Sequence, residues 1–217
     1  MEGSRDLEVL KVSQLFCERD ERILFQDLTF SVSGGQILQI KGSNGSGKTT
    51  LLRILCGLNS GYLGSITWRD KPIGECLHEF YSSLTYIGHR VGVNKVLTPI
   101  ENLRWVSNLH HRVTDQTIYS TLQKMGLKGF EESQCFSLSA GQQQRVSLSK
   151  LPLIRSKIWV LDEPFTTLDV EGIELLENLL CEHVHRGGLA LVTTHHQLAI
   201  PGITTVSYTH LTLPTKA

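Results

Sequence analysis

The sequence lacks an excess of charge, a paired-cysteine motif and a long apolar run, and each absence excludes a class of protein. Its 217 residues carry 21 basic and 21 acidic side chains, so net charge gives no reason to expect nucleic acid or a membrane surface as partner. The five cysteines are odd in number, widely spread and without a C-x-x-C pair, which argues against a zinc site or a disulfide framework. They fit a reducing, cytosolic compartment.

No apolar run approaches the roughly 18 residues that a membrane-spanning helix needs, and residues 1–10 lack the apolar stretch of a signal peptide. We therefore expect a chain that is soluble by itself and meets a membrane only through a partner. An apolar fraction of 40% in 217 residues suits one globular domain, expected over residues 1–205. The threonine-rich end, residues 206–217, has neither helical nor strand period and is expected to be a non-native or disordered tail.

Strand and helix patterns alternate along the chain, which predicts an α/β domain with a largely parallel core sheet. Apolar runs and alternation predict strands at residues 7–12, 28–32, 36–40, 66–68, 84–87, 158–161 and 189–193. Helical spacing predicts helices at residues 50–58, 100–109, 114–125 and 172–185. The middle, about residues 95–150, has few strand signals and is expected to be an inserted small helical subdomain.

A glycine-rich loop between a predicted strand and a predicted helix matches G-x-x-x-x-G-K-[ST] in full. Its glycines allow successive N–H groups to point at phosphate oxygens, and the following helix directs its positive dipole end toward the same oxygens. In this motif the lysine reaches the β- and γ-phosphates and the threonine hydroxyl ligates Mg²⁺. We therefore predict that ATP and Mg²⁺ are bound by Gly42, Ser43, Asn44, Gly45, Ser46, Gly47, Lys48 and Thr49, with Thr50 opening the helix.

The apolar run Ile158–Leu161 ends in two adjacent carboxylates. A buried parallel strand reads as a continuous apolar run, and its carboxyl end faces the ligand crevice. Asp162 is thus placed to bind Mg²⁺, and Glu163 to act as general base on an attacking water. A solvated acidic turn before Pro164 is the alternative.

Residues 138–142, LSAGQ, resemble the LSGGQ signature of ATP-binding cassette (ABC) proteins, with alanine at the third position. Ser139 is a favoured helix N-cap, and Gly141 lets the backbone approach a ligand. In that family the segment clamps the γ-phosphate held by the partner's loop, so the resemblance implies a head-to-tail homodimer with two ATP molecules. An ordinary capped helix is the alternative. The implied fold is the ABC ATPase fold: a P-loop NTPase core with a mainly parallel sheet, an N-terminal antiparallel β part and an inserted helical subdomain.

Two further segments resemble elements of the same family. Residues 164–169, PFTTLD, resemble the D-loop, which places Asp169 at the dimer seam. Thr193-Thr194-His195 resembles the switch histidine, which implies that His195 contacts the γ-phosphate and orients Glu163. A structural histidine is the alternative. His196 is expected to face away.

Two positions depart from the family pattern. His89 stands where most members carry a glutamine that touches Mg²⁺ and the attacking water, and an imidazole differs from an amide in reach and in pH dependence. For the residue that stacks on adenine, the candidates are Arg19, through its guanidinium, and Phe16.

Taken together, four features resemble the ATP-binding subunits of the haem exporters of cytochrome c biogenesis. They are the minimal length and the segments LSAGQQQRV, YIGHR and WVLDEPFTTLD. The resemblance implies a peripheral subunit on the cytoplasmic face of the bacterial inner membrane, with integral membrane transporter subunits as partners. Haem would be handled only through those partners. The alternatives are an ABC subunit for another substrate, or a soluble ABC ATPase of metal-cluster assembly or DNA maintenance. We expect solvated side chains rather than haem ligands at His110, His111, His183 and His185.

Overall fold

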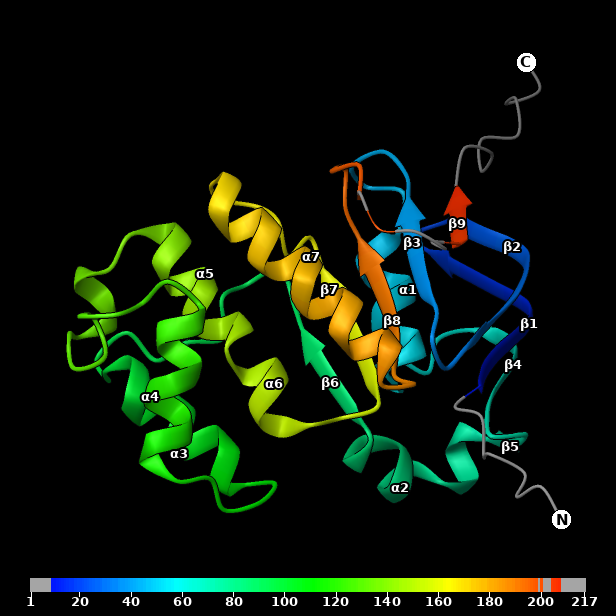
Figure 1. Ribbon diagram of the computed structural model, residues 1–217. Coiled ribbons are helices and arrows are strands. Elements are labelled where there is room, and N and C mark those ends of the chain that lie inside the picture. Colours follow the sequence, from blue (N-terminus) through cyan, green and yellow to red (C-terminus); the bar gives the residue numbers. More distant parts are fainter. Residues whose placement is uncertain (1–8, 199, 201–203, 208–217) are drawn as a thin grey trace, which may run out of the picture.

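The computed structural model describes residues 9–198, 200 and 204–207, the last four by their backbone alone. Two sheets and a group of helices make up the chain (Figure 1). The antiparallel sheet has strand order β2-β1-β4-β5, and the parallel sheet has order β6-β7-β8-β3-β9. The predicted fold is therefore confirmed, including its antiparallel N-terminal part.

The antiparallel sheet is formed by β1 (Val9–Arg19), β2 (Arg22–Ser33), β4 (Leu63–Trp68) and β5 (Lys71–Pro72). β1 continues well beyond the predicted end at Val12. The prediction stopped short because the register of β1 with β2 shifts three times along its length. Each shift breaks the alternation that marks a strand in sequence. The buried side chains Leu10, Val12 and Leu15 pack toward the parallel sheet.

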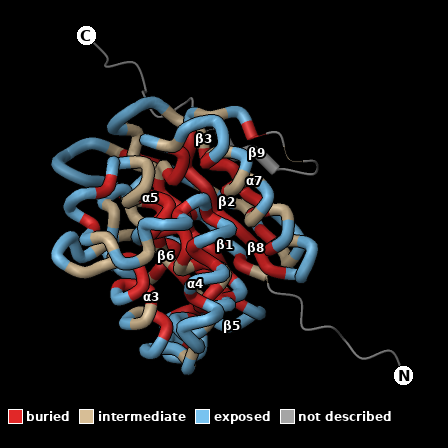
Figure 2. The backbone as a smooth tube through the Cα atoms, turned by 60° about the vertical axis from the view of Figure 1, so that its left-hand side comes forward, coloured by how far each residue is buried: buried red, intermediate tan, exposed pale blue. Residues whose placement is uncertain are grey.

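The parallel sheet contains β3 (Ile37–Lys41), β6 (Leu84–Ile87), β7 (Ile158–Asp162), β8 (Leu189–Thr193) and β9 (Thr204–Ser207). The three central strands are buried throughout or nearly so, because both faces of the sheet are covered (Figure 2). On one face, Ile158 and Val160 pack with α1 (Lys48–Leu55) and the antiparallel sheet. On the other face, Trp159 and Leu161 pack against α7 (Val170–His185) and its neighbours.

The helices α3 (Pro99–Asn108), α4 (Asp115–Lys124), α5 (Ala140–Leu148) and α6 (Lys150–Ile154) gather on the side away from the antiparallel sheet (Figure 1). Thr98 and Thr114 cap the first two, each accepting a backbone N–H bond three residues on. A short helix, α2 (Leu77–Ser82), precedes β6. No described helix has the length and apolarity needed to cross a membrane.

Two expectations about the C-terminal part are wrong. Val206 and Ser207 were expected to lie outside the fold, but in β9 they pair with Ile40 and Lys41 at the edge of the parallel sheet. Pairing at a sheet edge uses backbone groups, and Thr and Val favour strands, so no alternating period is required. Residues 208–217, the rest of the expected tail, lie outside the described residues. The other correction is His183, which is buried rather than solvated.

Candidate nucleotide-binding site

The glycine-rich loop joins β3 to α1, as its motif predicts. α1 begins at Lys48, two residues before the predicted start, because Gly47 acts as its N-cap in a left-handed conformation with φ of 94°. A Cβ on Gly47 would lie 3.2 Å from the Cβ of Leu24, so the position requires glycine for both conformation and space. The loop therefore directs the N-terminus of α1 toward the carboxyl ends of the parallel strands.

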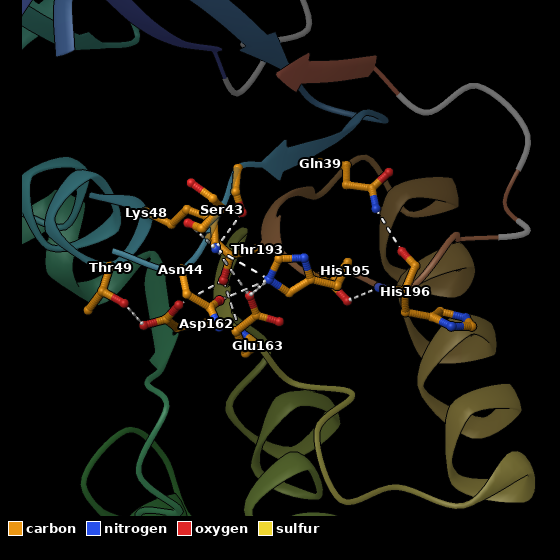
Figure 3. Close-up of polar contacts among 12 residues, drawn as sticks. Gln39, Ser43, Asn44, Lys48, Thr49, Asp162, Glu163, Thr193, His195 and His196 are labelled. Carbon is orange, nitrogen blue, oxygen red and sulfur yellow. Dashed lines mark hydrogen bonds and ion pairs between the residues drawn. The ribbon is translucent and has the colours of Figure 1, made fainter. Parts of the chain in front are cut away.

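Lys48 extends along this loop (Figure 3). Its Nζ donates hydrogen bonds to the carbonyl oxygens of Gly42, at 2.8 Å, and Ser43, at 3.2 Å. The same Nζ lies 3.7 Å from Oε1 of Glu163, and the lysine side chain is only 9% exposed. A cation is thus held at the loop, where the phosphate-binding motif requires one.

Asp162, the last residue of β7, is 2% exposed. Its Oδ2 accepts a hydrogen bond from the Thr49 hydroxyl at 2.8 Å, and its Oδ1 accepts one from the Thr193 hydroxyl at 2.7 Å. Three elements, α1, β7 and β8, therefore converge on one buried carboxylate (Figure 3). The sequence predicted Thr49 and Asp162 separately as residues that bind Mg²⁺, and it assigned no role to Thr193. Its place at the end of a strand next to β7 was the available signal.

Glu163 adopts a left-handed backbone with φ of 51°, which is rare for a non-glycine residue and is concentrated at functional sites. Its backbone N–H donates to the Thr193 hydroxyl at 2.9 Å and to the Thr193 carbonyl at 3.0 Å. These bonds turn the carboxylate toward Lys48 and His195, whose Nε2 lies 3.6 Å from Oε1 of Glu163. His195 Nε2 is also 3.3 Å from Oδ1 of Asn44. The predicted base and switch histidine are thus neighbours at the loop.

A cavity of about 620 Å³ opens over this group. Arg19 and His89 line it, whereas Phe16 is not among its lining residues. Asp20, Arg22 and Leu24 also line it and were missed, because no sequence motif marks the start of β2 as part of the site. The full lining set is Arg19, Asp20, Arg22, Leu24, Asn44, Gly45, Gly47, Lys48, Thr49, Thr50, His89, Asp162 and Glu163.

Ser139 and Gly141 lie elsewhere, and neither lines this cavity. Ser139 caps α5, accepting from the Gln142 N–H at 3.2 Å while its own N–H donates to the Gln142 side chain at 2.9 Å. A Cβ on Gly141 would lie 2.8 Å from the Thr167 carbonyl oxygen, so glycine is required for packing within the chain. Arg145 on the same helix pairs with Asp169 and with Glu171. α5 is therefore fixed to the segment that resembles the D-loop.

A P-loop between strand and helix, a carboxylate pair at the end of an adjacent strand and a separate capped signature helix define an ABC-type ATPase. Comparison with known proteins agrees, since the ABC transporter family profile matches residues 25–166. The chain belongs to this family, and within it to the cytochrome c biogenesis ATP-binding export proteins CcmA. It is 46% identical to the CcmA of Hahella chejuensis, over 89% of this chain and 92% of that protein.

The CcmA of Pseudomonas fluorescens is 47% identical, with 88% of this chain and 90% of that protein covered. A solved structure, a putative ABC transporter ATP-binding protein from Pyrococcus furiosus, has a TM-score of 0.81 at 20% identity. The match covers 92% of this chain and 96% of the Pyrococcus furiosus chain, and it supports the fold alone. The chain is therefore an ATP-binding ABC ATPase, and the prediction of the family is confirmed.

Proposed function

We propose that this chain is the ATP-hydrolysing subunit of a haem exporter complex in c-type cytochrome biogenesis. Its membership of the CcmA family supports the biological setting, because those relatives are described as cytochrome c biogenesis ATP-binding export proteins. The observation that carries the enzymatic part is the convergence of Lys48, Glu163 and His195 within 3.5 to 3.7 Å of one another.

The glycine-rich loop is the proposed phosphate-binding element. Residues 42–47 offer backbone N–H groups, α1 offers its N-terminal dipole, and Lys48 offers a charge to the β- and γ-phosphates. Thr50 continues the first turn of α1. Arg19 lies at the cavity wall in an exposed pair with Asp20, at 3.5 Å, and its guanidinium can stack on the adenine ring.

The residues around Asp162 fit Mg²⁺. A carboxylate 2% exposed and bonded to two hydroxyl groups is a buried negative charge, and hydroxyl and carboxylate oxygens are the ligands that Mg²⁺ prefers. The described residues hold no cluster of three or more His, Cys, Asp or Glu side chains suited to a metal, so phosphate oxygens and water must complete the shell. When bound, Mg²⁺ would neutralise charge on the β- and γ-phosphates. Thr49 and Asp162 would hold it, and His89, which lines the same cavity, is the further candidate for contact with the metal.

Glu163 is the proposed general base. It takes a proton from the water whose oxygen attacks the γ-phosphorus, while the bond to the β–γ bridging oxygen breaks. Lys48 and His195 stabilise the charge that spreads over the γ-phosphoryl oxygens. Because catalysis here is positioning plus electrostatic stabilisation, an incomplete site should turn over slowly.

The second half of the site is proposed to come from another copy. Ser139 and Gly141 lie outside the chain's own cavity, so in a head-to-tail homodimer the N-terminus of α5 would meet the γ-phosphate held by the partner's loop. Integral membrane subunits are the proposed further partners, which would place the chain peripherally on the cytoplasmic face of the inner membrane. Nucleic acid is not an expected partner, and haem would be met only through the membrane subunits.

The test of this function is Glu163→Gln in the full chain. The amide cannot accept the proton, so the rate of Mg·ATP hydrolysis should fall by about a hundredfold or more while ATP binding, measured by equilibrium titration, persists. Glu174→Gln, an exposed change on α7, is the matched control and should leave both values unchanged. Undiminished hydrolysis by Glu163→Gln would refute the assigned chemistry.

A further inference from the structure

His196, the residue after the switch histidine, is held by contacts to three separate elements. Its imidazole Nε2 lies 3.3 Å from Oε1 of Glu177 on α7. Its ring centroid is 5.0 Å from that of Phe165, at an interplanar angle of 34°. Its carbonyl oxygen accepts a hydrogen bond of 2.9 Å from Nε2 of Gln39 on β3 (Figure 3). The side chain, which is 34% exposed, therefore lies against α7 and Phe165, on the side away from Lys48.

The polar partners of His196 are themselves enclosed. Gln39 is 3% exposed and the Glu177 side chain 18% exposed, so neither can exchange its contact for water freely. The His196 N–H donates to the Thr194 hydroxyl at 2.9 Å, which closes a tight turn directly behind His195. By contrast, the His195 side chain is 60% exposed. The backbone that follows His195 is thus fixed by hydrogen bonds, while its own exposed ring extends toward Asn44, Lys48 and Glu163.

The ring contact between His196 and Phe165 links the two catalytic segments. Phe165, 7% exposed, follows Glu163 by two residues, and His196 follows His195 by one. The tilted contact between the two rings therefore joins the segment that carries the proposed base to the segment that carries the proposed switch histidine. The distance of 3.6 Å between Glu163 Oε1 and His195 Nε2 depends on how these segments sit relative to each other.

We propose that His196 is a positioning residue for ATP hydrolysis: anchored by Glu177 on α7, it sets the separation of Glu163 and His195 through its contact with Phe165. This inference rests on the proposed function of those two residues. His196 is not among the residues that line the cavity of the proposed nucleotide site. Its loss should therefore reduce turnover without reducing ATP affinity, because a small misplacement of reacting groups lowers rate more than binding.

The experiment compares steady-state ATPase kinetics of the purified full chain with those of three variants. His196→Ala removes both side-chain contacts and should lower kcat about tenfold, with KM for ATP within about twofold of wild type. His196→Gln keeps an N–H donor within reach of Glu177 and should recover kcat to within about threefold. His185→Ala, an exposed histidine near the end of α7, is the control and should behave as wild type.

A second pair separates positioning from general destabilisation. Glu177→Gln is close to isosteric and should lower kcat in the same sense, and the double variant His196→Ala with Glu177→Gln should be no slower than His196→Ala alone. Thermal unfolding midpoints identify any variant that is unfolded at the assay temperature. If His196→Ala is unfolded, the kcat of Glu177→Gln tests the inference in its place. Equal kcat in folded His196→Ala or Glu177→Gln and wild type would overturn the inference. Glu163→Gln, assayed in parallel, shows whether the proposed function itself has failed.

Discussion

At the residue scale, His183 lies on the last turn of α7 but is 8% exposed. Its ring stacks on Trp159 of β7, with centroids 3.8 Å apart and an interplanar angle of 7°, and its Nε2 lies 3.1 Å from the Leu189 carbonyl oxygen. Burial lowers the pKa of His183 to about 4. The folded chain therefore holds this imidazole neutral at neutral pH.

This enclosure predicts an acid-dependent loss of stability. Between pH 4 and 6.5 the unfolded chain, with the ordinary imidazole pKa of 6.5, binds the proton more readily than the folded chain. Stability therefore rises with pH across this window and is lost as the pH falls. From pH 7 to 4.5 wild type should lose about 2 kcal/mol more than His183→Phe, which keeps a stacked ring but does not titrate.

Urea unfolding at both pH values measures this difference, and His185→Phe, which replaces an exposed histidine, is the control. Equal acid sensitivity of wild type and His183→Phe would contradict the account. The helical spacing of Leu176, Leu180 and His183 places all three on one face, so the sequence did carry this information. The burial of His183 was missed because only the apolar residues of α7 were used to predict its buried face.

At the element scale, α7 and β8 are joined by a turn in which two adjacent glycines have different requirements. Gly187 has φ of 82°, and a Cβ there would meet nothing within 4 Å. A Cβ on Gly188 would lie 2.2 Å from Cε1 of His183, whose ring is held against Trp159. The turn can therefore approach the stacked pair only where position 188 has no side chain.

The comparison of Gly188→Ala with Gly187→Ala tests this packing. Overpacking at position 188 should lower the free energy of unfolding by about 2 kcal/mol or more. Position 187 has only a left-handed backbone to strain, which should cost about 1 kcal/mol. Chemical denaturation measures both. Equal stabilities, or a more stable Gly188→Ala, would show that the stacked ring has room to move.

The sequence indicates elements well where a single period decides them. β6 (Leu84–Ile87) and β8 have the predicted bounds, and β7 ends one residue later than predicted, since buried parallel strands are short apolar runs between turns. The sequence does not predict the extent of elements whose bounds are set by tertiary contacts. β1 extends to Arg19 through shifts of register that no period reveals, and β9 exists because β3 offers an open edge. In the site, the loop and the two carboxylates follow from motifs, whereas the bonds of Thr193 to Asp162 and Glu163, and the place of Arg22 in the cavity wall, arise from the fold.

At the scale of the whole molecule, the two helix N-termini proposed to bind phosphate, those of α1 and α5, do not share a cavity in the described chain. The N-terminus of α1 faces the cavity with Lys48 and Asp162, while Ser139 caps α5 outside that cavity's lining. Arg145 on α5 pairs with Asp169 and Glu171 at the start of α7, so the signature helix is linked to the segment that resembles the D-loop. A second copy is therefore the proposed source of the missing half of each site.

Chemical crosslinking across the proposed dimer tests this central claim most directly. Asn44→Cys and Ser139→Cys, both at exposed positions, are combined with Glu163→Gln to retain ATP and with Cys181→Ser, since the other four native cysteines are buried. A short bismaleimide should yield a covalent dimer only when Mg·ATP is present, and Asn108→Cys in place of Ser139→Cys should yield none. The absence of a nucleotide-dependent covalent dimer at any protein concentration would contradict the shared site.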